Sequence, residues 1–102
     1  MIEKKRAQSA IMAGNVLGPL SHPTRLLIVC LLLERERYVL ELLEHLGTTK
    51  GNISQHLTVL TSKKLIKKRK EANRIYYSIA DERLRVLVRT IQELFCPGLG
   101  LA

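Results

Sequence analysis

The sequence predicts a mainly α-helical fold with a β-hairpin wing, a winged helix-turn-helix with its elements in the order α-α-α-α-β-β-α. A short helical stretch that ends at Gly47 is followed at once by an amphipathic stretch over residues 49–60. A run rich in Lys and Arg then leads into a β-branched and aromatic segment, as in a hairpin. A final stretch, residues 81–95, has apolar side chains at helical spacing.

The whole chain is short and basic. Its 102 residues fit a single domain over 1–102, and a domain of this size buries a modest share of its surface, so pairing with a second copy would help it. A net charge of +8 favours a polyanionic partner, either nucleic acid or, as the competing interpretation, a membrane surface. The longest apolar run, residues 26–33, is too short to span a bilayer, and no signal peptide is apparent. We therefore expect a cytoplasmic protein with no membrane partner.

Two helices are expected before the helix-turn-helix. The first covers about residues 3–17, with apolar side chains at roughly helical spacing, and should stop near Gly18-Pro19. Pro23 suits the first position of the second helix, with Ser21 or His22 as its N-cap. This second helix is apolar nearly all round, which places it at the centre of the core. After it, residues 38–39 are expected to form a short strand.

The helix-turn-helix is predicted over about residues 40–63. Its first helix ends at Gly47, because glycine readily adopts the left-handed conformation at a helix C-terminus. Thr49 is a natural N-cap for the second helix. That helix has one apolar stripe and an opposite face of side chains that donate and accept hydrogen bonds, which is typical of a DNA recognition helix rather than an ordinary surface helix. The candidate DNA-binding residues are Thr49, Lys50, Asn52, Ser54 and Gln55.

These five residues are suited to different contacts. Gln55 and Asn52 can present paired donor and acceptor groups to adenine, and Lys50 can reach guanine or phosphate. Ser54 and Thr49 suit phosphate binding through their hydroxyls and the backbone amides at the helix start. His56 faces partly inward on the same helix and is interpreted as a packed histidine.

A basic hairpin is predicted over about residues 65–79. Its turn is expected at Ala72-Asn73, because asparagine tolerates a positive φ. A basic run beside a recognition helix is better explained as a wing that contacts phosphates or the minor groove than as a merely solvated strand face. The candidate wing contacts are Lys67, Lys68, Arg69 and Arg74.

The last helix is predicted over residues 81–95, with Asp81 as its N-cap. Its apolar residues recur at helical spacing and form one continuous stripe. The stripe consists of Leu84, Leu87, Val88, Ile91 and Leu94.

The order and spacing of four motifs resemble the ArsR/SmtB family of winged-helix repressors. The motifs are LSHPTRL at 20–26, ISQHL at 53–57, LI at 65–66 and IYYSI at 75–79, and the likeness covers residues 16–96. The resemblance implies a homodimer built from the first and last helices, so that the apolar stripe of the last helix becomes an interface. It also implies double-stranded DNA, with a near-palindromic operator, as the partner.

The metal sites known in that family have no counterpart in this sequence. The arsenic and cadmium sensors carry cysteines in the short helix before the turn, where this chain has the apolar and acidic residues 39–43. The zinc sensors need a histidine on the last helix, and none lies between Asp81 and Leu94. We therefore assign no metal site and no cofactor.

The two cysteines, Cys30 and Cys96, form no C-x-x-C motif, and a purely structural disulfide is not expected in a reducing cytoplasm. Their flanking residues and their spacing look like the family's subgroup of sulfide and persulfide sensors. In that subgroup two thiols react with persulfides or oxidants to form a polysulfide or disulfide link within one subunit, and DNA affinity changes. The resemblance therefore implies reactive sulfur species as the effector.

Alternatives to this sulfur switch stay open at the level of the sequence. Among its apolar neighbours Cys30 could be simply a small buried hydrophobe, in a constitutive, ligand-free architectural or interaction module. The two thiols could bind a metal or metalloid, although no third ligand is apparent. The chain could also be a small thiol enzyme or sulfur carrier, against which neither cysteine has an acid or base beside it. The leading prediction is not an enzyme but a homodimeric repressor whose operator affinity falls when Cys30 and Cys96 become linked.

Overall fold

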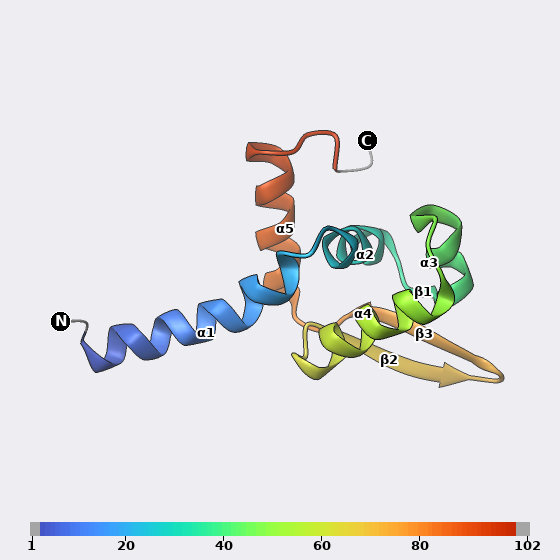
Figure 1. The fold of residues 1–102 in the computed structure, drawn as a ribbon, viewed down its shortest axis with the longest axis horizontal. Coiled ribbons are helices and arrows are strands. Elements are labelled where there is room, and N and C mark those ends of the chain that lie inside the picture. Colours follow the sequence, from blue (N-terminus) through green and yellow to red (C-terminus); the bar gives the residue numbers. More distant parts are fainter. Residues whose placement is uncertain (1–2, 100–102) are drawn as a thin grey trace.

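The computed structural model describes residues 3–99, and it confirms the predicted mainly α fold with a β-hairpin wing (Figure 1). The helices and strands follow one another closely along the chain. In order they are α1 (Lys4–Leu20), α2 (Pro23–Glu34), β1 (Arg37–Tyr38), α3 (Val39–Leu46), α4 (Lys50–Ser62), β2 (Ile66–Glu71), β3 (Arg74–Ile79) and α5 (Glu82–Leu94).

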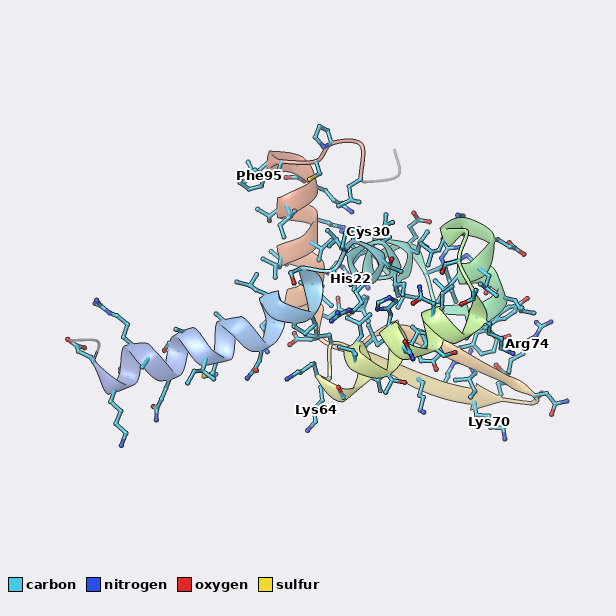
Figure 2. All side chains as sticks on the ribbon, viewed as in Figure 1. His22, Cys30, Lys64, Lys70, Arg74 and Phe95 are labelled. Carbon is cyan, nitrogen blue, oxygen red and sulfur yellow. The ribbon has the colours of Figure 1, made fainter. Side chains whose placement is uncertain are left out.

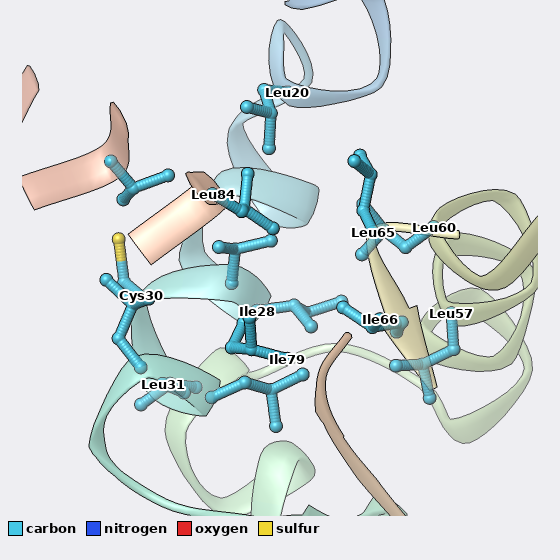
Figure 3. Close-up of a cluster of buried hydrophobic side chains, with 14 of the residues drawn as sticks. Leu20, Ile28, Cys30, Leu31, Leu57, Leu60, Leu65, Ile66, Ile79 and Leu84 are labelled. Atoms are coloured by element: carbon cyan, nitrogen blue, oxygen red, sulfur yellow. The ribbon is translucent and has the colours of Figure 1, made fainter. Parts of the chain in front are cut away.

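Helix α2 is the centre of the core, as its all-round apolar sequence predicts. Every residue from Ile28 to Leu33 is buried. Helices α4 and α5 and strand β3 contact it, and the start of β2 joins the same buried cluster, which brings segments distant in sequence together (Figure 3). The buried side chains that these elements contribute are Ile53, Leu57, Leu60, Leu65, Ile66, Ile79, Leu84 and Val88.

The junction between α1 and α2 confirms one prediction and corrects another. His22 is the N-cap of α2, because its Nδ1 accepts a hydrogen bond from the Thr24 backbone N–H at 3.2 Å, and Pro23 takes the first helical position. Helix α1, however, runs through Pro19 to Leu20 instead of stopping near Gly18-Pro19. The backbone N–H and the hydroxyl of Ser21 both donate to the Gly18 carbonyl, at 3.1 and 2.7 Å, and so cap this last turn.

Two arginines satisfy carbonyl groups at the C-terminus of α2. The buried Arg37 donates from Nε to the Leu31 carbonyl at 3.1 Å and pairs with Glu34 at 2.6 Å. Arg85 of α5 donates from Nη1 to the Leu33 carbonyl at 2.5 Å. Because the last carbonyls of a helix lack partners within it and carry partial negative charge, these guanidinium groups stabilise the end of α2 and hold α5 against it.

The three-stranded antiparallel sheet has the order β1-β3-β2, and β2 and β3 form the wing hairpin. The turn occupies the predicted residues, but Ala72 rather than Asn73 has the positive φ, at 54°. A positive φ at the first central residue of a two-residue hairpin turn matches the twist of the flanking strands. The predicted strand at residues 38–39 is also shifted: Val39 begins α3, because the Glu41 carboxylate accepts from the Tyr38 N–H at 3.2 Å and caps the helix there.

Helix α1 extends away from the rest of the molecule, as Figure 1 shows, and the described chain measures 51 × 29 × 22 Å. Most of the helix is exposed, including the apolar side chains of Ile11, Met12 and Leu17. Within residues 3–99 no single helix is long and apolar enough to cross a membrane; α1 and α2 pass that test together only as a pair bent by 90°.

Candidate nucleic-acid interface and thiol pair

The start of α4 is held by the predicted cap. The Thr49 hydroxyl oxygen accepts a hydrogen bond from the Asn52 backbone N–H at 3.1 Å. The Asn52 side-chain amide in turn donates to the Thr48 hydroxyl at 3.0 Å, and Asn52 is half-buried. Asn52 therefore has an internal partner that competes with the predicted contact to adenine.

The remaining predicted contacts of α4 lie on its exposed face. The opposite face is fixed in the core by Ile53 and Leu57, which are almost fully buried. Lys50, Ser54 and Gln55 are exposed, and within residues 3–99 the side chains of Lys50 and Gln55 form no hydrogen bond with the protein. The helix is therefore fixed in the core, and its outer face presents an amide and an ammonium group. Such a face is suited to forming hydrogen bonds with another molecule.

The wing residues differ in how much charge they present. Lys67 and Lys68 are exposed on β2 and make no ion pair among the described residues. Arg69 donates from Nη2 and Nε to the two carboxylate oxygens of Glu36, at 2.6 and 2.8 Å, and pairs with Glu71 at 2.7 Å. Hydrogen bonds to these carboxylates raise the pKa of Arg69, and their negative charges offset its positive charge. Arg69 thus anchors the wing to the body, which the sequence prediction of a phosphate contact did not anticipate.

Arg74 is also engaged within the protein. Its guanidinium lies over the Tyr38 ring, 4.4 Å from the centroid, and Tyr38 packs edge-on against Tyr76. Arg74 and Lys70 nevertheless lie along the exposed part of the wing, away from the core (Figure 2). The positive charge that the wing presents at its surface therefore comes chiefly from its lysines.

A contact between two imidazoles joins α4 to the N-terminus of α2. The rings of His22 and His56 are 4.4 Å apart between centroids and tilted by 47°. Burial lowers the pKa of His56, and the positive charges of His22 and Arg25 lower it further. His56 is half-buried, in agreement with its interpretation as a packed histidine.

We expect the burial of His56, together with the neighbouring charges, to make the free energy of unfolding depend on pH. Because the pKa of folded His56 lies below the ordinary value of about 6.5, the unfolded chain takes up the proton first as the pH falls. The stabilisation is fully present above that pH and is lost as the pH falls through the interval down to the folded pKa. Urea unfolding at pH 8 and pH 5.5, at one fixed protein concentration, should show a smaller loss for His56→Gln than for the wild type. If both proteins lost the same free energy of unfolding between pH 8 and pH 5.5, His56 would not be the source of the pH dependence.

Cys30 is a buried thiol in contact with α5. Its side chain is 8% exposed, and its Sγ accepts a hydrogen bond from Gln92 Nε2 at 3.3 Å. Burial raises the pKa of the thiol, while the Gln92 hydrogen bond opposes that shift, and the charges of Glu34 and Cys96 raise it slightly further. Figure 3 shows Cys30 at the edge of the buried cluster, and Figure 2 shows it on the side of the molecule opposite the wing.

Cys96 is exposed and lies just beyond Phe95, the C-cap of α5. Its backbone N–H donates to the Gln92 carbonyl at 3.2 Å, so the same residue contacts both cysteines. Both thiols are free. A covalent link between them would join α2 to the C-terminal end of α5. Sequence reasoning did not single out Gln92, although its position one helical turn before Cys96 was a usable signal.

No group of three or more His, Cys, Asp or Glu side chains that could hold a metal ion is present among residues 3–99. The thiol pair therefore has no third ligand of these types beside it in this part of the chain. Thiol-bound metals usually require three or four protein ligands.

The apolar stripe of α5 divides into a buried and an outward-facing part. Leu84 and Val88 are almost fully buried in the core of the protomer, so little of either side chain is left for a second copy to contact. Leu87 and Ile91 are half-buried, and Leu94 is 70% exposed. The stripe was predicted as one interface because helical spacing alone does not separate the side of α5 that packs on α2 from the side that does not.

An apolar groove of about 430 Å³ lies between α1 and the start of α5. It is continuous with the exposed apolar residues of α1, whose helical spacing is apparent from the sequence. Its apolar lining consists of Met12, Ala13, Val16, Leu17, Leu65, Leu84 and Leu87.

The chain resembles known regulators over nearly its whole length. A family model described as "Bacterial regulatory protein, arsR family" matches residues 22–68, from the cap of α2 into β2. Over 93 residues the chain is 34% identical to the biofilm growth-associated repressor of Xylella fastidiosa, a match that covers 91% of this chain and 79% of that protein.

Two solved structures show the same fold. Reduced HlyU from Vibrio cholerae is 28% identical, with a TM-score of 0.86 over 92% of this chain and 99% of that chain. The homodimeric winged helix-turn-helix DNA-binding domain Mb0332 from Mycobacterium bovis, described as a possible ArsR-family transcriptional regulator, is 29% identical, with a TM-score of 0.80 over 91% of this chain and 86% of that chain. The relatives are regulators, which contradicts the alternative of a small thiol enzyme or sulfur carrier. This chain therefore belongs to the arsR family of bacterial regulatory proteins.

Proposed function

We propose that this arsR-family transcriptional regulator binds a near-palindromic DNA operator as a homodimer, and that linking Cys30 to Cys96 lowers its operator affinity. The observation that carries the DNA-binding part is the outer face of α4, where Lys50, Ser54 and Gln55 are exposed beside the lysine-bearing wing. The net charge of +8 supplies the long-range attraction to phosphate.

The dimer is supported by apolar surface that one protomer leaves uncovered. Helix α1 exposes Met12 and Leu17 beside the groove, and the end of α5 exposes Leu94 and Phe95, which is 77% exposed. Large apolar side chains left exposed in this way indicate an interaction site in a small protein. The homodimeric structure named above, with its similar fold, makes a second copy the partner that we propose for this surface.

The proposed switch is an ordinary thiol exchange with a persulfide donor R–S–SH. The Cys30 thiolate attacks the outer sulfur, so that a new S–S bond to Cys30 forms while the S–S bond of the donor breaks. The released R–S⁻ takes up a proton from solvent and leaves as the thiol R–SH. The Cys96 thiolate then attacks the Cys30 sulfur, which gives a Cys30–Cys96 disulfide and releases H₂S. If both cysteines carry an extra sulfur, their condensation releases one H₂S and leaves a trisulfide. In the disulfide case the two thiols are oxidised and the donated sulfur is reduced to sulfide. In the trisulfide case one of the two donated sulfurs is reduced to sulfide and the other stays in the link.

The link would act on DNA binding through helix position. Cys30 belongs to the central helix α2, whereas Cys96 follows α5, whose outer face is part of the proposed dimer surface. Pulling the end of α5 towards α2 would alter how two protomers meet, and therefore the separation of their two α4 helices. Half-sites on DNA are spaced by the helical turn, so a change of a few ångströms in that separation lowers affinity.

The experiment compares operator binding before and after treatment with a persulfide donor. An operator is first selected from random double-stranded DNA with the reduced protein. The reduced wild type should bind it tightly and the treated wild type weakly, whereas Cys30→Ser and Cys96→Ser should bind equally with and without treatment. Peptide mass spectrometry of the treated wild type should find Cys30 and Cys96 linked.

The outcomes separate the two parts of the proposal. If no DNA sequence is enriched, the proposed operator binding is wrong. If the protein binds the operator but persulfide treatment leaves its affinity unchanged, the proposed operator binding is supported and the proposed thiol switch is wrong. A link that carries extra sulfur only after persulfide treatment supports sulfur sensing, while the same plain disulfide after persulfide and after peroxide indicates a general redox switch.

A further inference from the structure

We infer that Gln92 is the positioning residue of the thiol pair: its side-chain amide stabilises the Cys30 thiolate, and its backbone carbonyl holds Cys96 at the neighbouring turn. This inference rests on the proposed thiol switch and names the residue that makes the buried cysteine reactive. Gln92 lies on α5, is half-buried, and belongs to neither the DNA-facing surface nor the apolar face.

The first support is the contact between the amide and the sulfur. Nε2 of Gln92 lies 3.3 Å from Sγ of Cys30, a side chain that is only 8% exposed. Water cannot solvate a charge well at such a position, so a buried cysteine ordinarily stays a thiol. A hydrogen bond from an N–H group to the sulfur favours the thiolate over the neutral thiol, because a hydrogen bond to a charged acceptor is stronger than one to a neutral acceptor.

The second support is the backbone of the same residue. The Gln92 carbonyl accepts the Cys96 backbone N–H at 3.2 Å, and this bond extends the helical hydrogen bonding beyond Leu94, the last residue of α5. Gln92 therefore contacts the nucleophile through its side chain and the resolving cysteine through its main chain. A residue in this position couples the reactivity of one thiol to the placement of the other.

The third support is a small opening at the sulfur. A pocket of about 100 Å³ is lined by Cys30, Leu33, Glu34, Arg89 and Gln92. Liquid water takes roughly 30 Å³ per molecule, so the pocket admits the reacting end of a donor and leaves its body outside. Arg89 makes no ion pair within residues 3–99, and its cation offers attraction to an anionic persulfide.

These contacts assign one role in the first exchange step. Gln92 donates to the Cys30 anion before attack, and that anion supplies the electron pair for the new bond to the outer sulfur of R–S–SH. The contact weakens once the sulfur is covalently bound and neutral. No proton or electron passes through the amide, so Gln92 positions and stabilises the thiolate without taking part in bond making.

The test measures the thiolate of Cys30 directly. In a Cys96→Ser background Cys30 is the only cysteine, and its rate of alkylation by iodoacetamide is followed from pH 6 to 10.5. Gln92→Leu removes the donor, and Gln92→Glu replaces it with an acceptor of the same size. Both should raise the pH midpoint of alkylation, by about one pH unit or more, with Gln92→Glu raised further. Glu93→Gln, at the adjacent exposed position, is the matched control and should keep the parent midpoint.

The pH midpoint separates a change in the thiolate from a change in access, which would alter the rate at all pH values equally. An unchanged midpoint in Gln92→Leu and Gln92→Glu, with helical content retained by circular dichroism, would overturn the inference while leaving the proposed switch standing. A raised midpoint in a protein whose wild type shows no persulfide effect on DNA binding would support the role of Gln92 and remove the switch. With the switch intact, Gln92→Leu should also slow persulfide-driven linkage about tenfold at neutral pH.

Discussion

Gln55→Ala should lose about 30-fold or more of the specific operator affinity of the dimer. Gln55 is exposed on the outer face of α4, with no internal hydrogen bond among the described residues. A side-chain amide that pairs with a base edge contributes about 1–3 kcal/mol of discrimination, and a homodimer would use it twice. Fluorescence anisotropy with the selected operator and with unrelated duplex DNA, at one salt concentration, measures the specific and nonspecific affinities separately.

The loss for Gln55→Ala should be confined to the operator, because nonspecific binding depends on the cationic groups that the substitution leaves unchanged. Ser62→Ala, exposed on the same helix but at its far end, is the control and should bind like the wild type. Wild-type operator affinity in Gln55→Ala would show that the outer face of α4 does not read sequence.

Met12→Glu should convert the dimer to a monomer at micromolar concentration and lower operator affinity about 100-fold. Met12 is 69% exposed on α1 and lines the groove beside α5. An unpaired charge buried at an interface costs about 3–5 kcal/mol, and the dimer would carry two of them. A monomer can occupy only one half-site of the operator. Sedimentation velocity measures the assembly, and gel shifts measure the binding.

Leu40→Glu is the matched control for assembly. Leu40 is an apolar residue of similar exposure, 57%, on α3, and it lies outside the surface proposed for pairing. This variant should sediment as the wild-type dimer. A dimer that persists in Met12→Glu, or one that is lost equally in Leu40→Glu, would place the interface elsewhere than α1 and α5.

The two functions proposed for this protein are carried by opposite sides of the molecule. The outer face of α4 and the wing lie on one side, whereas Cys30 and the end of α5 lie on the other (Figure 2). Helix α2 contacts both α4 and α5, so the helix that bears Cys30 also supports the recognition helix. In the proposed switch, a change at the thiols would therefore reach DNA through the relative positions of whole helices.

Much of the fold could be predicted from the sequence because its signals are local. The caps at His22, Thr49 and Asp81 depend on side chains that bond to the next turn of their own helix, and all three were anticipated. The all-round apolar sequence of α2 could only be stable inside the core. The polar outer face of α4 followed from its helical spacing in the same way.

The partners of individual side chains were decided by the tertiary structure. The pairing of Arg69 with Glu36 joins residues 33 positions apart, and the contact of Gln92 with Cys30 joins residues 62 positions apart, so no local pattern reports them. For the same reason spacing placed Leu84 and Val88 on one stripe with Leu94, while packing against α2 buried the first two and left the third outside. The sequence by itself determined which helices form and which faces are apolar or polar, because these depend on neighbours within a few residues. Only the fold decided which cations stay unpaired for DNA and which amide reaches the buried sulfur, because those contacts require distant segments to meet.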